Sequence, residues 1–282
     1  DNAIAGMVAS LNDDYSLFTY DKETDISEMK LKGEYEGIGI TITQDDKGEI
    51  YVIGVEKNSS AEENKVEIGS KIKEINETDI SKMSINEVTK LIKNSENKKV
   101  KLKLEKDSEE KEVVLERKKI IFDSVSTKVY KEENKNIGYV KIVIFALNTA
   151  EQFKQEMKEL EKNNIDSLII DVRDNGGGHL STTKEIASYF LNSKNIIYQI
   201  ESKGEKTKYY STGKNNKNYP IAILTNNISA SGSELLTASL KENLGAVSIG
   251  EKTYGKGTVQ EMKDVGDNSK YKITAEKWLT PT

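Results

Sequence analysis

Several residue types that often build functional sites are scarce or absent in this chain. Its 282 residues include no cysteine, one histidine, one tryptophan and two prolines. Without cysteine the chain can form neither disulfide bonds nor thiolate metal sites. The sequence also lacks any apolar run near the roughly 20 residues that a membrane-spanning helix needs, and no signal peptide is visible at its start.

Charged residues are abundant, but neither sign is concentrated. Lysine and arginine total 42 and aspartate and glutamate total 47, giving a net charge of −5, and the two signs are interleaved without a basic block. This pattern argues against a dedicated nucleic-acid surface. Because Asp1 is not a natural start and Thr282 closely follows an apparent strand, we expect the sequence to be part of a longer protein.

The length allows about two domains at roughly 150 residues each, and the apolar pattern divides the chain into three parts. Residues 1–33 begin with a short amphipathic helix, residues 34–119 have the pattern of a small α+β module, and residues 120–282 alternate strands with helices. We therefore predict an α/β protein, α+β overall, with a layered core in its last part.

The local elements follow from periodicity and capping residues. Ser84 and Glu87 have the spacing of a capping box at the start of a helix, and Gly245 ends another helix. The apolar run at 167–172 has the pattern of a strand buried on both faces of a sheet. Further strands are predicted over 38–42, 51–55, 100–104, 113–115, 137–145, 221–224 and 246–249.

Ser231 is a candidate nucleophile because it lies between the end of a predicted strand and the start of a predicted helix. This arrangement exposes the hydroxyl at the carboxyl edge of the sheet, where sites of α/β proteins usually lie. It also directs helix N-terminal N–H groups at an incoming carbonyl oxygen. The alternative is that Ser231 only caps the helix, a role that Ser229 and Ser233 could fill equally well.

Lys256, between two glycines, could take the proton of such a serine if its amine were neutral. A free lysine has a pKa near ~10.4, so burial would have to lower it. In a strand, Gln260 would face the same way as Lys256 and could orient the amine. With one histidine in the chain, we expect a serine hydrolase of this composition to use lysine as its base. The alternative is an exposed strand lysine.

A glycine turn at 176–178 follows the apolar run that ends at Val172. Three glycines let the main chain turn tightly and present an N–H to a ligand. We assign this turn, paired with the N–H of Gly232, to an oxyanion hole. The alternative is a plain connection from a strand to a helix.

Two other motifs compete with this interpretation. Residues 250–256 nearly match a phosphate-binding loop, but Gly257 stands where serine or threonine is required, and no helix pattern follows. His179 directly follows the glycine turn and could serve as the base for Ser231 in place of Lys256.

The order and spacing of these segments resemble the C-terminal processing peptidases, also called tail-specific proteases. These are serine endopeptidases with a Ser–Lys dyad and an inserted PDZ domain. The resemblance covers nearly the whole chain and is carried by residues 12–16, 137–150, 171–178, 229–234 and 250–260. It implies that Ser231 is the nucleophile, Lys256 the general base and Gln260 the residue that orients it. Gly177 and Gly232 would supply the oxyanion N–H groups.

In the small module, the run at 37–40 looks like the carboxylate-binding loop of PDZ domains. The resemblance implies that a peptide binds at Gly37, Ile38, Gly39, Ile40, Val88 and Ile92. The sequence departs from the family where Gly176 replaces a usual proline and where residues 58–62 lack one. The second departure bears on the ligand preference of the PDZ domain.

The resemblance also implies a function. Residues 120–282 would form a protease core of the tail-specific type, with a PDZ domain at 34–119 and a helical segment at 1–33. The enzyme would cleave proteins near accessible C-terminal tails, with the PDZ domain binding the tail and gating the site, and without a metal or other cofactor. A homodimer and a bacterial envelope or secreted location, with a membrane anchor in the full-length protein, are further expectations. The alternative is an inactive, PDZ-bearing peptide-binding protein.

Overall fold

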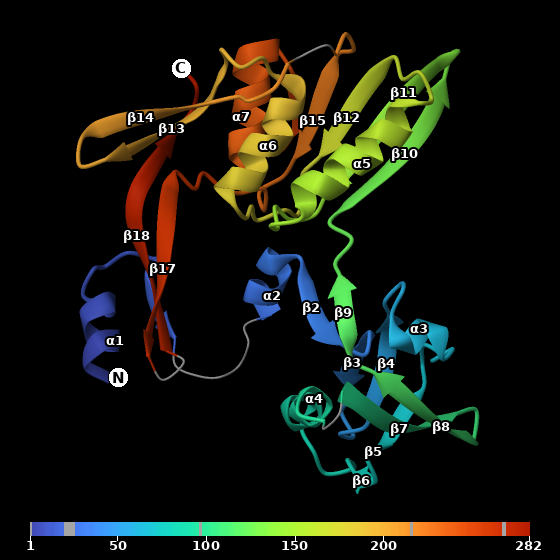
Figure 1. The fold of residues 1–282 in the computed structure, drawn as a ribbon. Coiled ribbons are helices and arrows are strands. Elements are labelled where there is room, and N and C mark those ends of the chain that lie inside the picture. The colour runs from blue at the N-terminus through green and yellow to red at the C-terminus, as the bar shows by residue number, and fades with distance from the viewer. Residues whose placement is uncertain (1, 20–25, 96–97, 215–216, 267–268) are drawn as a thin grey trace. The chain divides into compact units, whose positions relative to one another are not determined.

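The chain forms two compact units (Figure 1). The computed structural model describes residues 2–19, 26–95, 98–214, 217–266 and 269–282. Unit 1 comprises Asp1–Gly33 and Asp123–Thr282, and unit 2 comprises Glu34–Phe122. The apolar pattern of the sequence separates residues 1–33 from the core at 120–282. In the structure both belong to unit 1. Within residues 1–33, residues 1 and 20–25 lie outside the described part of the chain.

Unit 2 is built on an antiparallel sheet with the strand order β3-β4-β5-β7-β8, in which β6 pairs with β5, and β2 pairs separately with β9. Its helices are α3 (Ser60–Glu63) and α4 (Ile85–Lys93). The strands are β2 (Glu34–Gly37), β3 (Ile40–Gln44), β4 (Ile50–Val55), β5 (Lys71–Ile75), β6 (Thr78–Asp79), β7 (Lys99–Lys106), β8 (Glu109–Glu116) and β9 (Lys118–Ile121).

Local sequence signals account for two boundaries in unit 2. The predicted capping box of α4 is confirmed, since the Ser84 N–H donates to the Glu87 carboxylate and the Glu87 N–H donates to the Ser84 hydroxyl. The strand predicted from residue 38 begins two residues later, at Ile40. Gly39 has a φ of +87°, a left-handed conformation that interrupts an extended strand before Ile40.

The central sheet of unit 1 has the strand order β10-β11-β12-β15-β16. The pair of β10 and β11 is antiparallel, and the remaining pairs are parallel. The strands are β10 (Val125–Glu132), β11 (Lys135–Ile142), β12 (Ser167–Asp171), β15 (Ile221–Thr225) and β16 (Val247–Gly250). The helices α5 (Thr149–Glu161), α6 (Leu180–Phe190) and α7 (Gly232–Leu244) connect the parallel strands, as expected for crossovers.

Only one face of the central strands is fully buried. Leu168 and Ile170 of β12 are buried in one apolar cluster with residues of α5, α6 and α7, whereas Ile169 between them is only partly buried. The same alternation occurs on β15. The prediction that residues 167–172 form a strand buried on both faces is therefore confirmed for the face that the helices cover, whereas the other face is only partly buried in the described chain.

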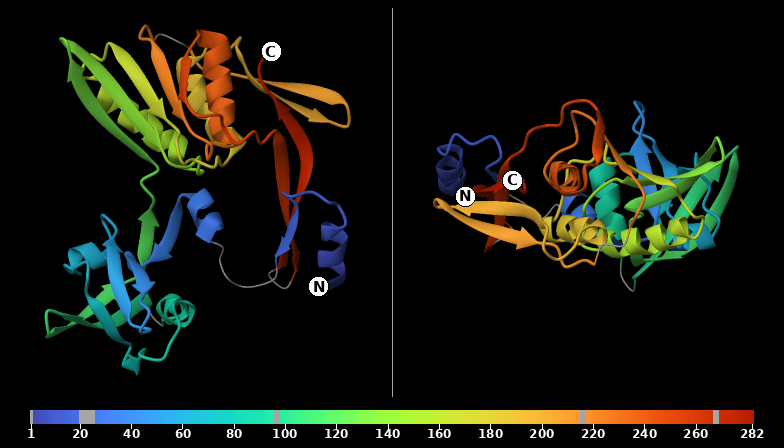
Figure 2. Two further views of the ribbon diagram at one scale, coloured as in Figure 1. Left: turned by 180° about the vertical axis from the view of Figure 1, so that it is seen from behind. Right: turned by 90° about the horizontal axis from the view of Figure 1, so that it is seen from above.

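A second sheet in unit 1 has the order β1-β18-β13-β14, with β17 also paired to β18. Figures 1 and 2 show β1 lying along the hairpin of β17 and β18. The strands are β1 (Leu17–Thr19), β13 (Ile196–Ser202), β14 (Glu205–Tyr210), β17 (Thr258–Gly266) and β18 (Ser269–Leu279). The remaining helices are α1 (Asn2–Ala9) and α2 (Ile26–Lys32). None of the described helices is long and apolar enough to cross a membrane.

Candidate active site

Ser231 is the N-cap residue of α7 and follows β15, at the predicted strand-to-helix turn. Its main chain has φ +51° and ψ −111°, which is a strained conformation for a residue with a side chain. Capping does not require this strain, because the caps Ser59 and Ser84 are extended, with φ of −94° and −72°. The conformation of Ser231 therefore points to a role beyond capping.

The neighbouring serines differ from Ser231 in exposure. Ser229 and Ser233 are fully buried, and their hydroxyl groups donate to the main-chain oxygens of Val172 and Asn175, each at 2.8 Å. Ser231 is partly exposed. Of the three serines in this segment, Ser231 is thus the one with a hydroxyl that a substrate can approach.

The glycine turn packs directly against the Ser231 segment. The Ala230 N–H donates to the Asn175 carbonyl at 3.1 Å, which joins the two segments. Gly177 has a φ of +103°, and a Cβ atom placed on it would lie 2.7 Å from the Cβ atom of Ser231 and 2.9 Å from the main-chain nitrogen of Gly232. Only glycine permits this approach.

Glu234 connects the Ser231 segment to the segment that carries Lys256. Its Oε2 atom accepts the main-chain N–H of Ser231 at 2.8 Å and that of Lys256 at 3.0 Å. Its Oε1 atom accepts the Gly255 N–H at 2.6 Å and the Thr253 hydroxyl at 2.8 Å. Glu234 is only 8% exposed. One buried carboxylate therefore holds the two segments together.

The amine of Lys256 lies over an aromatic ring of the N-terminal segment. Its Nζ atom is 5.2 Å from the ring centroid of Tyr15. Burial lowers the pKa of the Lys256 amine, and the positive charge of Lys272 lowers it further. The carboxylates of Glu234 and Asp13 oppose this shift. Among the described residues, no hydrogen bond joins the Lys256 amine to the Ser231 hydroxyl.

Gln260 lies on β17, whereas Lys256 precedes that strand. The pairing of β17 with β18 also shifts register between Val259 and Gln260. The premise that both residues face one way along a single strand is therefore wrong. The Gln260 side-chain amide donates to the Thr258 hydroxyl at 2.8 Å and to the Thr274 hydroxyl at 3.4 Å. Its role in orienting Lys256 stays a prediction.

The two predicted oxyanion donors, Gly177 and Gly232, differ in the hydrogen-bond partners of their N–H groups. The Gly177 N–H donates to the Asn175 side-chain oxygen at 2.9 Å, so it is already occupied. Gly232 is the first residue of α7, where helical N–H groups have no partner within the helix. Gly232 is thus the better placed of the two donors, and Gly177 could act only if its bond to Asn175 opened.

The structure gives less support to the two alternatives, His179 as the base and residues 250–256 as a phosphate-binding loop. The His179 ring nitrogen Nε2 lies 3.2 Å from the Leu31 main-chain oxygen, and no hydrogen bond to Ser231 is found among the described residues. The segment after residues 250–256 continues into β17, a strand, whereas a phosphate-binding loop leads into a helix. No group of three or more His, Asp or Glu side chains in the described part of the chain is arranged to hold a metal ion.

The predicted peptide-binding residues of unit 2 lie at the start of β3 and on α4. Gly37 ends β2, Ile38 and Gly39 are buried, and Ile40 begins β3. Val88 is 0% exposed and Ile92 is 9% exposed, because both pack in the core of the unit. In this structure neither of these two side chains offers an apolar surface to a ligand, and their binding role stays a prediction.

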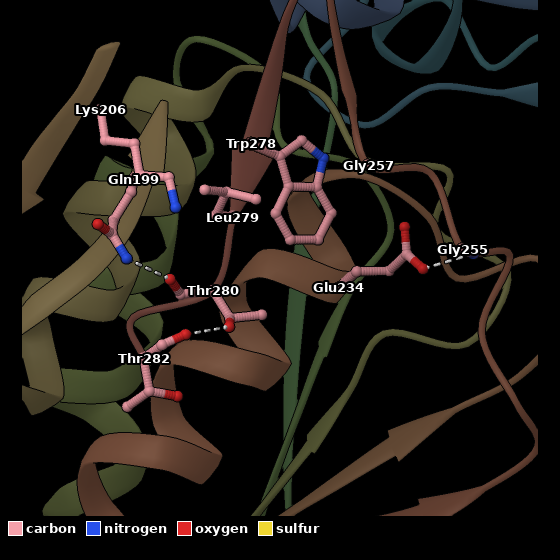
Figure 3. Close-up of a pocket in the computed structure, with 9 residues that line it drawn as sticks. All are labelled: Gln199, Lys206, Glu234, Gly255, Gly257, Trp278, Leu279, Thr280 and Thr282. Atoms are coloured by element: carbon pink, nitrogen blue, oxygen red, sulfur yellow. Dashed lines mark hydrogen bonds between the residues drawn. The ribbon is translucent and has the colours of Figure 1, made fainter. Parts of the chain in front are cut away.

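A pocket of about 460 Å³ borders Glu234 within unit 1. Figure 3 shows the Glu234 carboxylate directed at Gly255 on one side of this pocket and the Trp278 indole beside it. The lining residues are Gln199, Lys206, Glu234, Gly255, Gly257, Trp278, Leu279, Thr280 and Thr282. The pocket thus adjoins the segment that carries Lys256.

The sequence patterns assign no role to Glu234 or Tyr15. Glu234 stands three residues after Ser231, the same spacing that identified Ser84 and Glu87 as a capping box, so a signal was present. That signal explains its bond to the Ser231 N–H, but not its bonds to a segment about twenty residues further on. No local pattern marks Tyr15 as a neighbour of Lys256.

Comparison with known proteins places the chain in a family. Residues 136–282 match the family model described as peptidase family S41, and residues 26–105 match that of the PDZ domain. The chain therefore belongs to peptidase family S41, a family of C-terminal processing serine proteases, and it contains a PDZ domain. The mixed α/β fold matches the tail-specific protease fold.

Sequence and structural similarity to individual proteins supports this family assignment. The carboxy-terminal processing proteases CtpB and CtpA of Bacillus subtilis (strain 168) are 35% and 31% identical to the chain, over 100% and 99% of its length. The alignments cover 59% and 60% of those proteins, so the chain spans about three fifths of their length. The solved photosystem II D1 C-terminal processing protease has a TM-score of 0.59 at 25% identity, covering 99% of this chain and 77% of that chain.

Proposed function

We propose that this chain carries the catalytic centre of a serine endopeptidase that cleaves proteins near their C-termini, with Ser231 as nucleophile and Lys256 as general base. The single observation that carries the proposal is the shared acceptor, since one oxygen of Glu234 takes the main-chain N–H groups of both residues. The strain at Ser231 and the lowered pKa of Lys256 support the same assignment.

In the proposed reaction, the Ser231 Oγ attacks the carbonyl carbon of the peptide bond while the neutral Lys256 amine takes the hydroxyl proton. The Gly232 N–H at the start of α7 stabilises the resulting oxyanion. The lysine then gives the proton to the leaving amine, and water hydrolyses the acyl-enzyme. Burial of Lys256 favours this role because it increases the neutral fraction of the amine.

Unit 2 is proposed to bind the C-terminal tail of the substrate and to gate the site. β3 is an edge strand of the described sheet, so a peptide can add beside it through main-chain hydrogen bonds. The run at 37–40 leads into this strand, where free N–H groups would receive the terminal carboxylate. Dimer formation and an extracytoplasmic location stay predictions from the family resemblance.

Mass spectrometry of products from tail-varied peptides tests the proposal. We expect internal cleavage near the C-terminus by the wild type, loss of cleavage in Ser231→Ala and Lys256→Ala, and retention in the exposed controls Ser126→Ala and Lys252→Ala. Amidating the peptide terminus should slow cleavage, because it removes the carboxylate. A wild type that binds these peptides without cutting them would favour the inactive peptide-binding protein. Equal cleavage of free and amidated tails would contradict the role of unit 2.

A further inference from the structure

We propose that Tyr15 is a positioning residue for Lys256, with its ring face setting where the lysine amine lies. This inference rests on the proposed role of Lys256 as general base. The Nζ atom lies 5.2 Å from the ring centroid, within the roughly 6 Å over which an aromatic face attracts an amine cation. A segment from the other end of the chain thus contacts the lysine amine.

Hydrogen bonds hold the turn that carries Tyr15 on β18. The Asp13 carboxylate accepts the hydroxyl groups of Ser16 and Thr274, the latter at 2.8 Å. The Ser16 hydroxyl in turn accepts the Thr274 N–H at 3.1 Å. Directly after this turn, β1 pairs with β18, with Leu17 opposite Lys272. The ring therefore sits on a fixed part of unit 1.

The same threonine connects this turn to the predicted orienting residue. Gln260 donates to the Thr274 hydroxyl at 3.4 Å, and that hydroxyl donates to Asp13. Gln260 is thus bonded to the support of the Tyr15 ring, while the amine of Lys256 lies over the ring itself. In this structure the ring, and not the amide, is in contact with the amine.

Both ends of Lys256 are then constrained. Glu234 fixes its main chain beside Ser231, and Tyr15 limits the region that its flexible side chain visits. The attraction acts on the protonated amine, and a single cation–π contact at a partly exposed site is weak. The ring therefore holds the amine near the site before it loses its proton, and the neutral amine is free to reach Ser231. Removing the ring should therefore lower the rate of the chemical step and leave substrate binding unchanged.

Steady-state kinetics on tail-bearing peptides, with the whole chain, test this inference. Tyr15→Leu removes the aromatic face, and we expect kcat to fall about fivefold with KM unchanged. Tyr15→Phe keeps the face and should retain the wild-type kcat. Ser16→Ala leaves the ring in place but loosens its turn, and should give an intermediate kcat. Tyr130→Leu is the matched control, because the Lys128 amine lies 4.6 Å from the Tyr130 ring on β10.

The outcomes separate this inference from the proposed function. An unchanged kcat in Tyr15→Leu, an increase in kcat, or an effect on KM alone would each overturn the inference while leaving the Ser–Lys assignment intact. Equal losses in Tyr15→Phe and Tyr15→Leu would also overturn it, since the hydroxyl rather than the ring would then matter. If cleavage persists in Ser231→Ala, the proposed function fails, and the inference fails with it.

Discussion

The main-chain N–H groups of Ser231 and Lys256 donate to the same atom, Oε2 of Glu234, at 2.8 and 3.0 Å. The two residues come from different segments, one at the start of α7 and the other between β16 and β17. The shared acceptor sets the distance between their main chains before any substrate binds. A site that depends on this relationship should respond strongly to changes at Glu234.

Glu234→Gln should impair both activity and stability. The amide nitrogen would replace one of two oxygens that together accept four hydrogen bonds, and it would face N–H donors. Because each hydrogen bond to a buried charged group is worth about 1.5–3 kcal/mol, we expect a loss of about 3 kcal/mol in the free energy of unfolding, and a lower kcat/KM.

Urea denaturation and peptide kinetics measure the two effects. The control is Glu185→Gln on α6, which removes one charge of an exposed ion pair with Lys154 and should change the free energy of unfolding by less than about 1 kcal/mol. A Glu234→Gln variant with wild-type stability and activity would show that the hydrogen bonds of Glu234 to the two segments do not support the site.

The pH dependence of catalysis should follow the ionisation of Lys256. Only the neutral amine can take a proton, so kcat/KM should rise with pH and level off above the Lys256 pKa. Lys272 lowers this pKa, so Lys272→Met should raise it and move the rise in kcat/KM to higher pH. Asp13 and Glu234, which raise the pKa, remain unchanged in this variant.

The control for this experiment is Lys277→Met, an exposed lysine on the same strand β18. Its pH profile should coincide with that of the wild type. A Lys272→Met profile that shifts to lower pH, or that does not move, would show that the titrating group in catalysis is not Lys256.

Gly177→Ala should reduce activity by disturbing the nucleophile. Its φ of +103° is strained for any other residue, and the added methyl group would lie 2.7 Å from the Cβ atom of Ser231. We expect a loss of about 1–3 kcal/mol in the free energy of unfolding, together with slower cleavage. The control is Gly6→Ala in α1, where nothing lies within 4 Å and helix propensity favours alanine. Cleavage at the wild-type rate by Gly177→Ala would contradict the close packing.

The strain at Ser231 can be measured by comparing two inactive variants. Glycine tolerates the φ of +51°, whereas alanine does not. Ser231→Gly should therefore be more stable than Ser231→Ala by about 1 kcal/mol in chemical denaturation. If Ser231→Ala is the more stable variant, the positive φ is not a source of strain.

Elements with strong local signals could be predicted from the sequence. The capping residues of α4 and the glycine that ends α7 occur as expected. The predicted alternating strands of unit 2 also occur, although β3 begins two residues later than expected. The second sheet of unit 1 could not be predicted, because strands such as β14 are exposed on both faces and lack apolar alternation. Their pairing depends on contacts between distant parts of the chain.

The features of the candidate site also differ in whether the sequence could predict them. The strand-to-helix position of Ser231 follows from local sequence. The glycine turn packs against it because β12 and β15, the strands that precede the two segments, are parallel neighbours in the sheet. Two features depend on tertiary contacts: the ring of Tyr15 over Lys256 and the bonds from Glu234 to the lysine segment. Periodicity carries no information about such contacts between segments far apart in the sequence.

The most direct test of the Ser–Lys dyad is the rate of fluorophosphonate modification, with the modified residue located by mass spectrometry. We predict modification of Ser231 in the wild type, a rate lower by about 10²-fold or more in Lys256→Ala, and an unchanged rate in His179→Ala. Modification of Lys256→Ala at the wild-type rate, or loss of modification in His179→Ala, would contradict the account.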